Sequence, residues 1–311
     1  MAVFSLRGSR FTAGFVSVTL LMLYAAYLIN TADFPFTDLD VLRHYQMEKL
    51  NKNLGRVETV ILGDSAAGNA VDADLFSELS GRMTLNLSLA GSFGFIGDYN
   101  LVKYLHENAP YLKNIIIIHT LDIWQRTLSQ EAYFDTMRYA NFPERYYWIF
   151  PWRIGSYLGY TMNLKKAAHT ALSILRGKEP SIRIDEKYDY IPQGQERFSN
   201  GLKTIGPDTR LKETIKNTEM FVALDALCGE KAVNCIYMHG PIHEIMFNNS
   251  TVAIRRIDAI LQSAKSIKYI DTILHYENKY MGDSEDHIDP LYKRRVTKEY
   301  FDVLKSSGEL L

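Results

Sequence analysis

The sequence predicts an α/β fold built around a doubly wound parallel sheet of about five strands. Short apolar runs alternate with segments of helical spacing, the pattern of strands connected by covering helices. The run at 114–120 contains four consecutive isoleucines, a composition typical of a central parallel strand covered on both faces. The runs expected to form strands are residues 57–62, 83–87, 114–120, 233–239 and 267–271.

The segments between these runs have the spacing of amphipathic helices. One helix is expected to start near Asp72 or Asp74, which are both good N-cap residues, and to run to Leu79. The other expected helices are residues 38–50, 96–107, 164–176, 211–228, 251–264 and 291–305.

Residues 124–210 interrupt the alternation, and we interpret them as a large, aromatic-rich helical insertion after the third strand. All three tryptophans lie here, beginning with Trp124. The aromatic side chains fit the core of an ordinary helical subdomain, faces that stack on sugars, or a surface against a membrane or membrane partner. We expect some of Trp148, Phe150 and Trp152 to lie outside a sealed core.

The N-terminal segment predicts a membrane anchor. Phe11–Ile29 is a run of 19 residues without a charged side chain, long enough for one span. Arg7 and Arg10 precede it, which places the N-terminus in the cytoplasm. A cleaved signal peptide is the alternative, although its apolar region would be shorter. We expect a single-pass protein of the inner (cytoplasmic) membrane with residues 33–311 periplasmic or extracellular.

The expected domain organisation follows from these segments. Residues 1–32 form a cytoplasmic tip and transmembrane anchor, 33–56 a juxtamembrane connector, and 57–311 an α/β domain that includes the insertion. The formal net charge of -1 gives no basic footprint for nucleic acid, so no nucleic-acid partner is expected. No cofactor is expected either.

The chain has two cysteines, Cys228 and Cys235. An oxidising compartment would permit a disulfide across the short turn between them, which we expect. Two reduced, partly buried thiols are the alternative. Their spacing does not match a zinc ribbon or a Cys-x-x-Cys redox pair.

The first strand ends in Gly63-Asp64-Ser65, a turn of small and polar residues. Open α/β folds place their active sites at this edge of the sheet, so Ser65 is a candidate nucleophile. A phosphate-binding or purely structural turn is the alternative, but no Walker-type lysine follows. A serine nucleophile needs a base, and a histidine oriented by a carboxylate is suited to that role.

Three motifs resemble those of the SGNH/GDSL hydrolase superfamily, which has a flavodoxin-like sheet. Gly63-Asp64-Ser65 is similar to its first block, and residues 83–91 are similar to its second block, which ends at the oxyanion glycine Gly91. Asp283-Ser284-Glu285-Asp286-His287 is similar to its Asp-x-x-His block. The resemblance implies that Ser65 is the nucleophile and His287 the base.

Two departures from the family pattern concern the same site. Ser284 occupies the position of the family's aspartate, so either Asp283 or Asp286 supports His287, with Asp283 preferred, or a Ser–His dyad acts alone. Asp122 follows the third strand, where the family supplies an oxyanion asparagine, and an ionised aspartate cannot donate a hydrogen bond. The oxyanion donors are then the backbone N–H groups of Ser65 and Gly91.

Three further polar residues follow predicted strands or lie near their ends. Asn86 could brace the loop after the second strand. His239 and His243 follow the fourth strand with the spacing of a zinc pair, but Gly240 and Pro241 argue against a helix there. Contact with substrate and a purely structural role are the alternatives, and no metal is expected.

An anchor, an SGNH-like domain and a large insertion together resemble the membrane-anchored SGNH-like proteins of bacterial envelope polymer acylation. That group includes alginate O-acetylation proteins and the D-alanyl transfer protein of teichoic acid synthesis. The resemblance implies acyl transfer to a glycan through an acyl-serine intermediate, with a glycan or lipid-linked substrate and a multi-pass membrane O-acyltransferase as partner. The alternatives are a carbohydrate or lipid esterase and a catalytically degenerate scaffold or glycan-binding protein.

Overall fold

The computed structural model describes residues 3–32, 38–127, 129–137, 154–177 and 205–310. The chain divides into two compact units. The smaller unit comprises Met1–Val41 and Asn141–Pro180, and the larger comprises Leu42–Ala140 and Ser181–Leu311.

The larger unit is built on a five-stranded, wholly parallel sheet, as the sequence predicts. The strand order β2-β1-β3-β4-β6 is that of flavodoxin-like doubly wound sheets. The strands are β1 (Thr59–Gly63), β2 (Thr84–Asn86), β3 (Asn114–His119), β4 (Asn234–His239) and β6 (Lys268–Ile270). Each lies within two residues of its predicted bounds.

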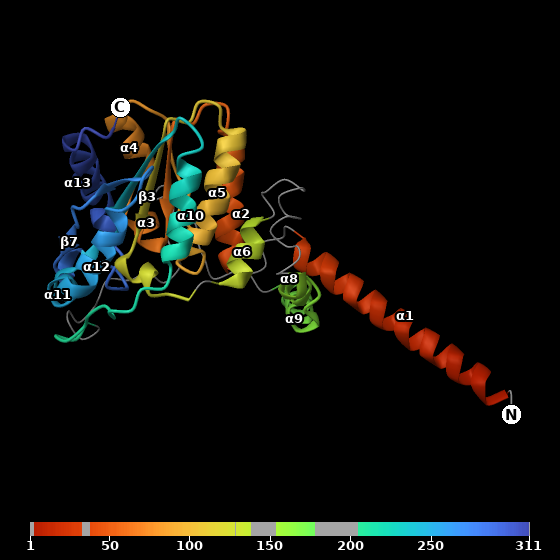
Figure 1. The fold of residues 1–311 in the computed structure, drawn as a ribbon. Coiled ribbons are helices and arrows are strands. Elements are labelled where there is room, and N and C mark those ends of the chain that lie inside the picture. The colour runs from red at the N-terminus through yellow and green to blue at the C-terminus, as the bar shows by residue number, and fades with distance from the viewer. Residues whose placement is uncertain (1–2, 33–37, 128, 138–153, 178–204, 311) are drawn as a thin grey trace. The chain divides into compact units, whose positions relative to one another are not determined.

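Helices cover both faces of this sheet, and Figure 1 shows α5 and α10 on one side of the strands and α4 and α13 on the other. In β3, Ile115 and Ile117 face one core while Ile116 and Ile118 face the other. The first core packs against α2 (Asp38–Asn51), α5 (Gly94–Asn108), α10 (Thr218–Cys228) and α12 (Thr251–Leu261). The second packs against α3 (Ser65–Ala70), α4 (Ala73–Ser80) and α13 (Lys293–Ser306).

The start of α4 was predicted from its capping residue. Asp72 caps α4 by accepting a hydrogen bond from the Leu75 N–H, as its residue type predicts. Helix α10 begins at residue 218, seven residues later than its apolar spacing suggests. The short elements that were not predicted are α3, η1 (Leu121–Trp124), α6 (Gln130–Met137), α8 (Ile154–Thr161), β5 (Ile242–His243), α11 (Glu244–Asn249), β7 (His275–Tyr276), η3 (Asn278–Tyr280) and η4 (Pro290–Tyr292).

Trp124 corrects the interpretation of residues 124–210 at their first position. Its side chain is fully buried in the first core, packs against Phe95 and Phe221, and donates a hydrogen bond from Nε1 to the Tyr237 hydroxyl. Trp124, which ends η1 shortly after β3, is therefore part of the sheet domain. The expectation for Trp148, Phe150 and Trp152 lies outside the described residues.

The predicted disulfide is wrong for this structure, since Cys228 and Cys235 are free cysteines. Both are buried in the first core, where a thiol packs as a small apolar side chain. The side chains are close enough that hydrogen bonding with Cys235, together with burial, raises the pKa of the Cys228 thiol.

The smaller unit contains α1 (Val3–Thr31), α8 (Ile154–Thr161) and α9 (Leu164–Leu175). Within α1, Thr12–Thr31 is long and apolar enough to cross a membrane. Both α8 and α9 pack against α1.

Candidate active site

Ser65 is the first residue of α3 and directly follows the end of β1. The tight passage from strand to helix depends on Gly63, which has φ +143°. A Cβ at that position would lie 1.8 Å from the carbonyl oxygen of Ile118 on the neighbouring strand. Only glycine fits this conformation and this close approach, so Gly63 fixes where the Ser65 hydroxyl is presented.

The structure brings Ser65, His287 and Asp283 together as one hydrogen-bonded chain. His287 Nε2 lies 2.8 Å from Ser65 Oγ, although the two residues are 222 positions apart. His287 Nδ1 lies 2.7 Å from Asp283 Oδ1. An ionised carboxylate only accepts, so Nδ1 carries the proton and Nε2 is left to accept the Ser65 O–H. This is the arrangement that activates a serine hydroxyl.

Asp286, the other candidate carboxylate, has a different partner. Its Oδ1 lies 3.8 Å from His287 Nε2, and it accepts a hydrogen bond of 2.5 Å from the Ser284 hydroxyl. The spacing of four residues between Asp283 and His287 therefore brings the carboxylate to the orienting nitrogen. Asp286 acts on the imidazole only through its charge.

The pKa of His287 is raised above its ordinary value. Burial alone would lower it, but the hydrogen bond to Asp283 and the negative charges of Asp286 and Asp283 favour the imidazolium. His287 is thus suited to hold a proton taken from the Ser65 hydroxyl.

The loop after β2 runs beside the end of β1. The Leu87 and Leu89 N–H groups donate to the carbonyls of Ile61 and Gly63, at 2.8 and 2.9 Å. Asn86 braces this loop, as the sequence suggests. Its amide donates to the carbonyls of Ala67 in α3 and of Val71 just after α3, and its carbonyl oxygen accepts from the Ser88 hydroxyl.

Two backbone N–H groups are candidates for an oxyanion hole at this edge. Within the described part of the chain, neither the Ser65 N–H nor the Gly91 N–H donates a hydrogen bond. The Ser65 N–H belongs to the first residue of a helix, where N–H groups have no intrahelical partner. Both groups are therefore left for a developing negative charge near the Ser65 hydroxyl.

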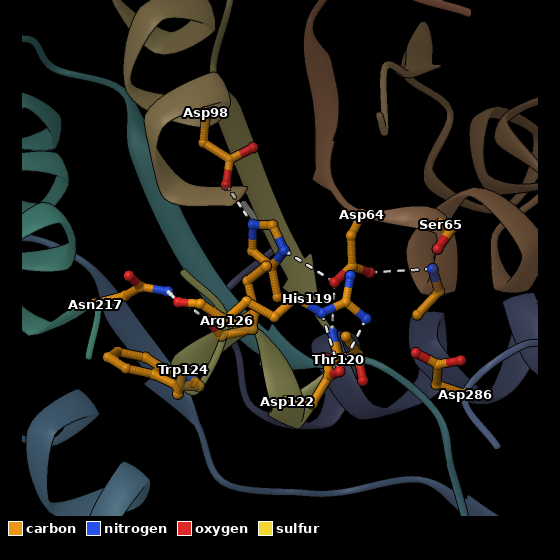
Figure 2. Close-up of polar contacts among 12 residues, drawn as sticks. Asp64, Ser65, Asp98, His119, Thr120, Asp122, Trp124, Arg126, Asn217 and Asp286 are labelled. Carbon is orange, nitrogen blue, oxygen red and sulfur yellow. Dashed lines mark hydrogen bonds and ion pairs between the residues drawn. The ribbon is translucent and has the colours of Figure 1, made fainter. Parts of the chain in front are cut away.

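A buried ion network lies next to Ser65, and Figure 2 shows its members. Asp64 accepts hydrogen bonds from the N–H groups of Ala66 at 3.0 Å and of Thr120 at 3.1 Å. Its Oδ2 also lies 3.2 Å from His119 Nδ1, and His119 Nε2 bonds to Asp98. Asp64 thereby ties the start of α3 to the end of β3.

Contacts between His119 and the two carboxylates determine which members of this network are charged. Burial would lower the pKa of His119, but the charge of Asp98 and the hydrogen bonds to Asp64 and Asp98 raise it to about 10. Burial would raise the pKa of Asp64, but the bond to His119 holds it below its ordinary value. At neutral pH a buried imidazolium therefore lies between two acidic side chains.

Asp122 follows β3 and, as an aspartate, was not expected to donate a hydrogen bond to an oxyanion. Its partner is Arg126. Asp122 Oδ2 accepts from Arg126 Nε at 2.9 Å, and a Cβ built on Gly91 would lie 1.7 Å from Arg126 Nη1. The guanidinium thus contacts Gly91, whose N–H is a candidate oxyanion donor. Burial raises the pKa of Asp122 to about 6, against the lowering effect of Arg126.

His239, the last residue of β4, and His243, in β5, both contact other parts of the fold. His239 is fully buried, and its Nε2 lies 2.9 Å from the Tyr269 hydroxyl. His243 caps α11 by accepting from the Ile245 N–H at 3.1 Å. No group of three metal-ligating side chains occurs among the described residues.

Asp98, His119 and Arg126 lie at the site but were not predicted from the sequence. Asp98 lies inside α5 and His119 at the end of an apolar strand, where nothing local indicates a partner. Arg126 lies four residues after Asp122, a spacing at which opposite charges meet on a helical turn, and this signal could have identified the pair.

Comparison with protein-family models, with curated proteins and with solved structures finds no match for this chain.

Proposed function

We propose that this chain is a membrane-anchored, extracytoplasmic acyltransferase of the SGNH type that modifies a cell-envelope or exported glycan through an acyl-Ser65 intermediate. The observation that carries the proposal is the hydrogen-bonded chain from Ser65 through His287 to Asp283. The apolar segment of α1, long enough for a span, supports the anchor.

In the first half-reaction, His287 Nε2 takes the Ser65 proton while Oγ attacks the acyl carbonyl carbon. The resulting oxyanion is held by the N–H groups of Ser65 and Gly91, beside the positive charge of Arg126. When the tetrahedral intermediate collapses, the bond to the donor oxygen breaks and His287 returns its proton to the leaving group.

In the second half-reaction, a glycan hydroxyl gives its proton to His287 and attacks the acyl-serine. Its collapse releases the acylated glycan and restores the Ser65 hydroxyl. A multi-pass membrane O-acyltransferase would supply the acyl donor. Water in place of the glycan hydroxyl would make the same site an esterase.

Covalent labelling tests the nucleophile directly. A fluorophosphonate probe should label the full-length protein once, on the peptide that contains Ser65, because only an activated serine reacts with it. The Ser263→Ala variant is the matched control, since Ser263 is an exposed hydroxyl after α12 and its loss should leave labelling unchanged. A folded protein that takes up no label would favour the scaffold alternative.

The pH dependence of acyl-enzyme formation should distinguish the role of Asp283 from that of Asp286. The pKa of His287 is raised, so acyl-enzyme formation should be lost as the pH falls through that raised value and His287 protonates. Asp283→Asn should reduce kcat by about 10²–10⁴-fold, the contribution of general base catalysis, and move the acidic limb to lower pH. Asp286→Asn should move that limb in the same direction but largely preserve kcat.

The comparison of these two variants assigns the orienting carboxylate. Equal losses of kcat in Asp283→Asn and Asp286→Asn would show that the geometric assignment to Asp283 is wrong. Stopped-flow measurement of leaving-group release from an activated ester gives both kcat and the position of the acidic limb. A range of about 5 pH units, from about pH 4 to about pH 9, covers the pKa values of perturbed histidines.

A further inference from the structure

Helices α8 and α9 meet at the C-terminal end of the candidate membrane span. Asn30 lies one residue before the last residue of α1, and its buried amide donates to the carbonyls of Thr161 and Asn163 at 2.9 and 3.1 Å. Figure 1 shows both helices at this end of α1. The α8–α9 junction is therefore fixed at the level where the span would leave the bilayer.

Helix α9 has three different sides. Ala167 and Thr170 are buried on the side toward α1. A second side carries an exposed apolar stripe at helical spacing, and Leu172 and Leu175 on it are 49% and 81% exposed. The stripe consists of Leu164, Ala168, Leu172 and Leu175.

The third side of α9 is basic and adjoins the apolar stripe. Lys165, His169 and Arg176 are exposed one position after residues of that stripe. Residues 154–177 contain no aspartate or glutamate. A helix with an apolar face, a cationic flank and no acidic residue has the composition of segments that lie in the headgroup region of an anionic bilayer.

We propose that α9 lies in the outer interface of the membrane that α1 crosses, with its apolar stripe in the acyl-chain boundary and its basic side on anionic lipid headgroups. Lipid is favoured as the occupant because the stripe begins at the junction held by Asn30, at the end of the span, and because the cationic flank complements anionic headgroups. The proposal rests on α1 as a span and is independent of the chemistry at Ser65.

Site-directed spin labelling of the full-length chain in nanodiscs of phosphatidylcholine and phosphatidylglycerol tests this placement. Nitroxides on Leu172→Cys and Leu175→Cys should collide with dissolved oxygen several-fold more, relative to a water-soluble nickel chelate, than a nitroxide on the matched control His169→Cys. The wild-type chain sets the labelling background, since Cys228 and Cys235 are buried.

Other patterns of oxygen and nickel collision would overturn the proposal. Equal oxygen-to-nickel ratios at the three positions would place the stripe in water. Exclusion of both reagents at positions 172 and 175 would mean that protein, not lipid, covers the stripe. The oxygen-to-nickel ratio at position 172 should also fall in discs without phosphatidylglycerol and in the Lys165→Gln/Arg176→Gln variant. If neither change alters this ratio, the basic side does not bind the headgroups.

Discussion

Replacing Ser65 with alanine should abolish acyl transfer and fluorophosphonate labelling, with a loss in kcat on the order of 10⁴–10⁶-fold. In the proposed mechanism the Ser65 hydroxyl receives the acyl group, because His287 Nε2 lies 2.8 Å from Oγ and His287 is hydrogen-bonded to Asp283. Without Oγ the covalent route does not exist, and the remaining donors at Ser65 and Gly91 can stabilise only a direct attack on the donor.

The same substitution should leave the fold unchanged. Ser65 is half-buried, and its side chain forms no hydrogen bond in the described structure besides that to His287. The interactions that fix the start of α3 are made by Asp64, which accepts from the Ala66 N–H. We therefore expect the free energy of unfolding to change by less than about 1 kcal/mol, as measured by urea denaturation.

A combined variant sharpens the test of mechanism. Ser65→Ala/His287→Ala should be no less active than either single variant, because a nucleophile and its base act as one unit. Ser263→Ala again serves as the control and should retain full activity. Multiplicative losses in the double variant, or unchanged glycan modification in cells that carry only Ser65→Ala, would contradict the acyl-serine route.

The sheet could be predicted from the sequence because β1, β3 and β4 contain apolar runs that end in small or polar residues. The four isoleucines of β3 indicate burial on both faces, and the structure places alternate members in the two cores. Ser65 and His287 could be paired because motif order and strand order both place them at one sheet edge. These are local signals, or signals that follow from topology alone.

The rest of the site depends on contacts that no local pattern encodes. Asp64 follows β1, Asp98 lies in α5 and His119 ends β3. His119 is 55 residues from Asp64 and 21 residues from Asp98 in the sequence, yet it contacts both. A histidine after four isoleucines resembles an ordinary strand end until its two carboxylate partners are placed. The cysteines show the reverse error, since compartment and spacing permit a disulfide that the structure does not contain.

Replacing His119 with alanine should destabilise the larger unit by about 3–5 kcal/mol, the usual cost of breaking a buried ion pair by removing one partner. Asp64 and Asp98 would then be buried without the positive charge that lies between them and that both contact. Urea denaturation of the full-length protein in detergent measures the loss. His169→Ala is the matched control, because His169 is exposed on α9 and should change stability by less than about 0.5 kcal/mol.

The pH dependence of stability distinguishes an ionic role of His119 from a packing role. Its folded-state pKa of about 10 lies above the ordinary value of 6.5. The stabilisation it provides should therefore be fully present below pH 6.5 and be lost as the pH rises through about 10. The wild-type protein should lose stability over this range, and His119→Ala should lack that slope. Parallel stability curves for the two proteins would show that His119 is held as a neutral side chain.

The network also explains why a loss of stability at His119 should reach the nucleophile. Asp64 is the only member that contacts both the α3 start and the end of β3, through the N–H groups of Ala66 and Thr120. Asp98→Asn keeps the shape of its side chain but removes one charge, so it should weaken labelling of Ser65 less than His119→Ala does. If His119→Ala labels at the wild-type rate under conditions where it is fully folded, Asp64 holds the start of α3 through its two backbone bonds alone.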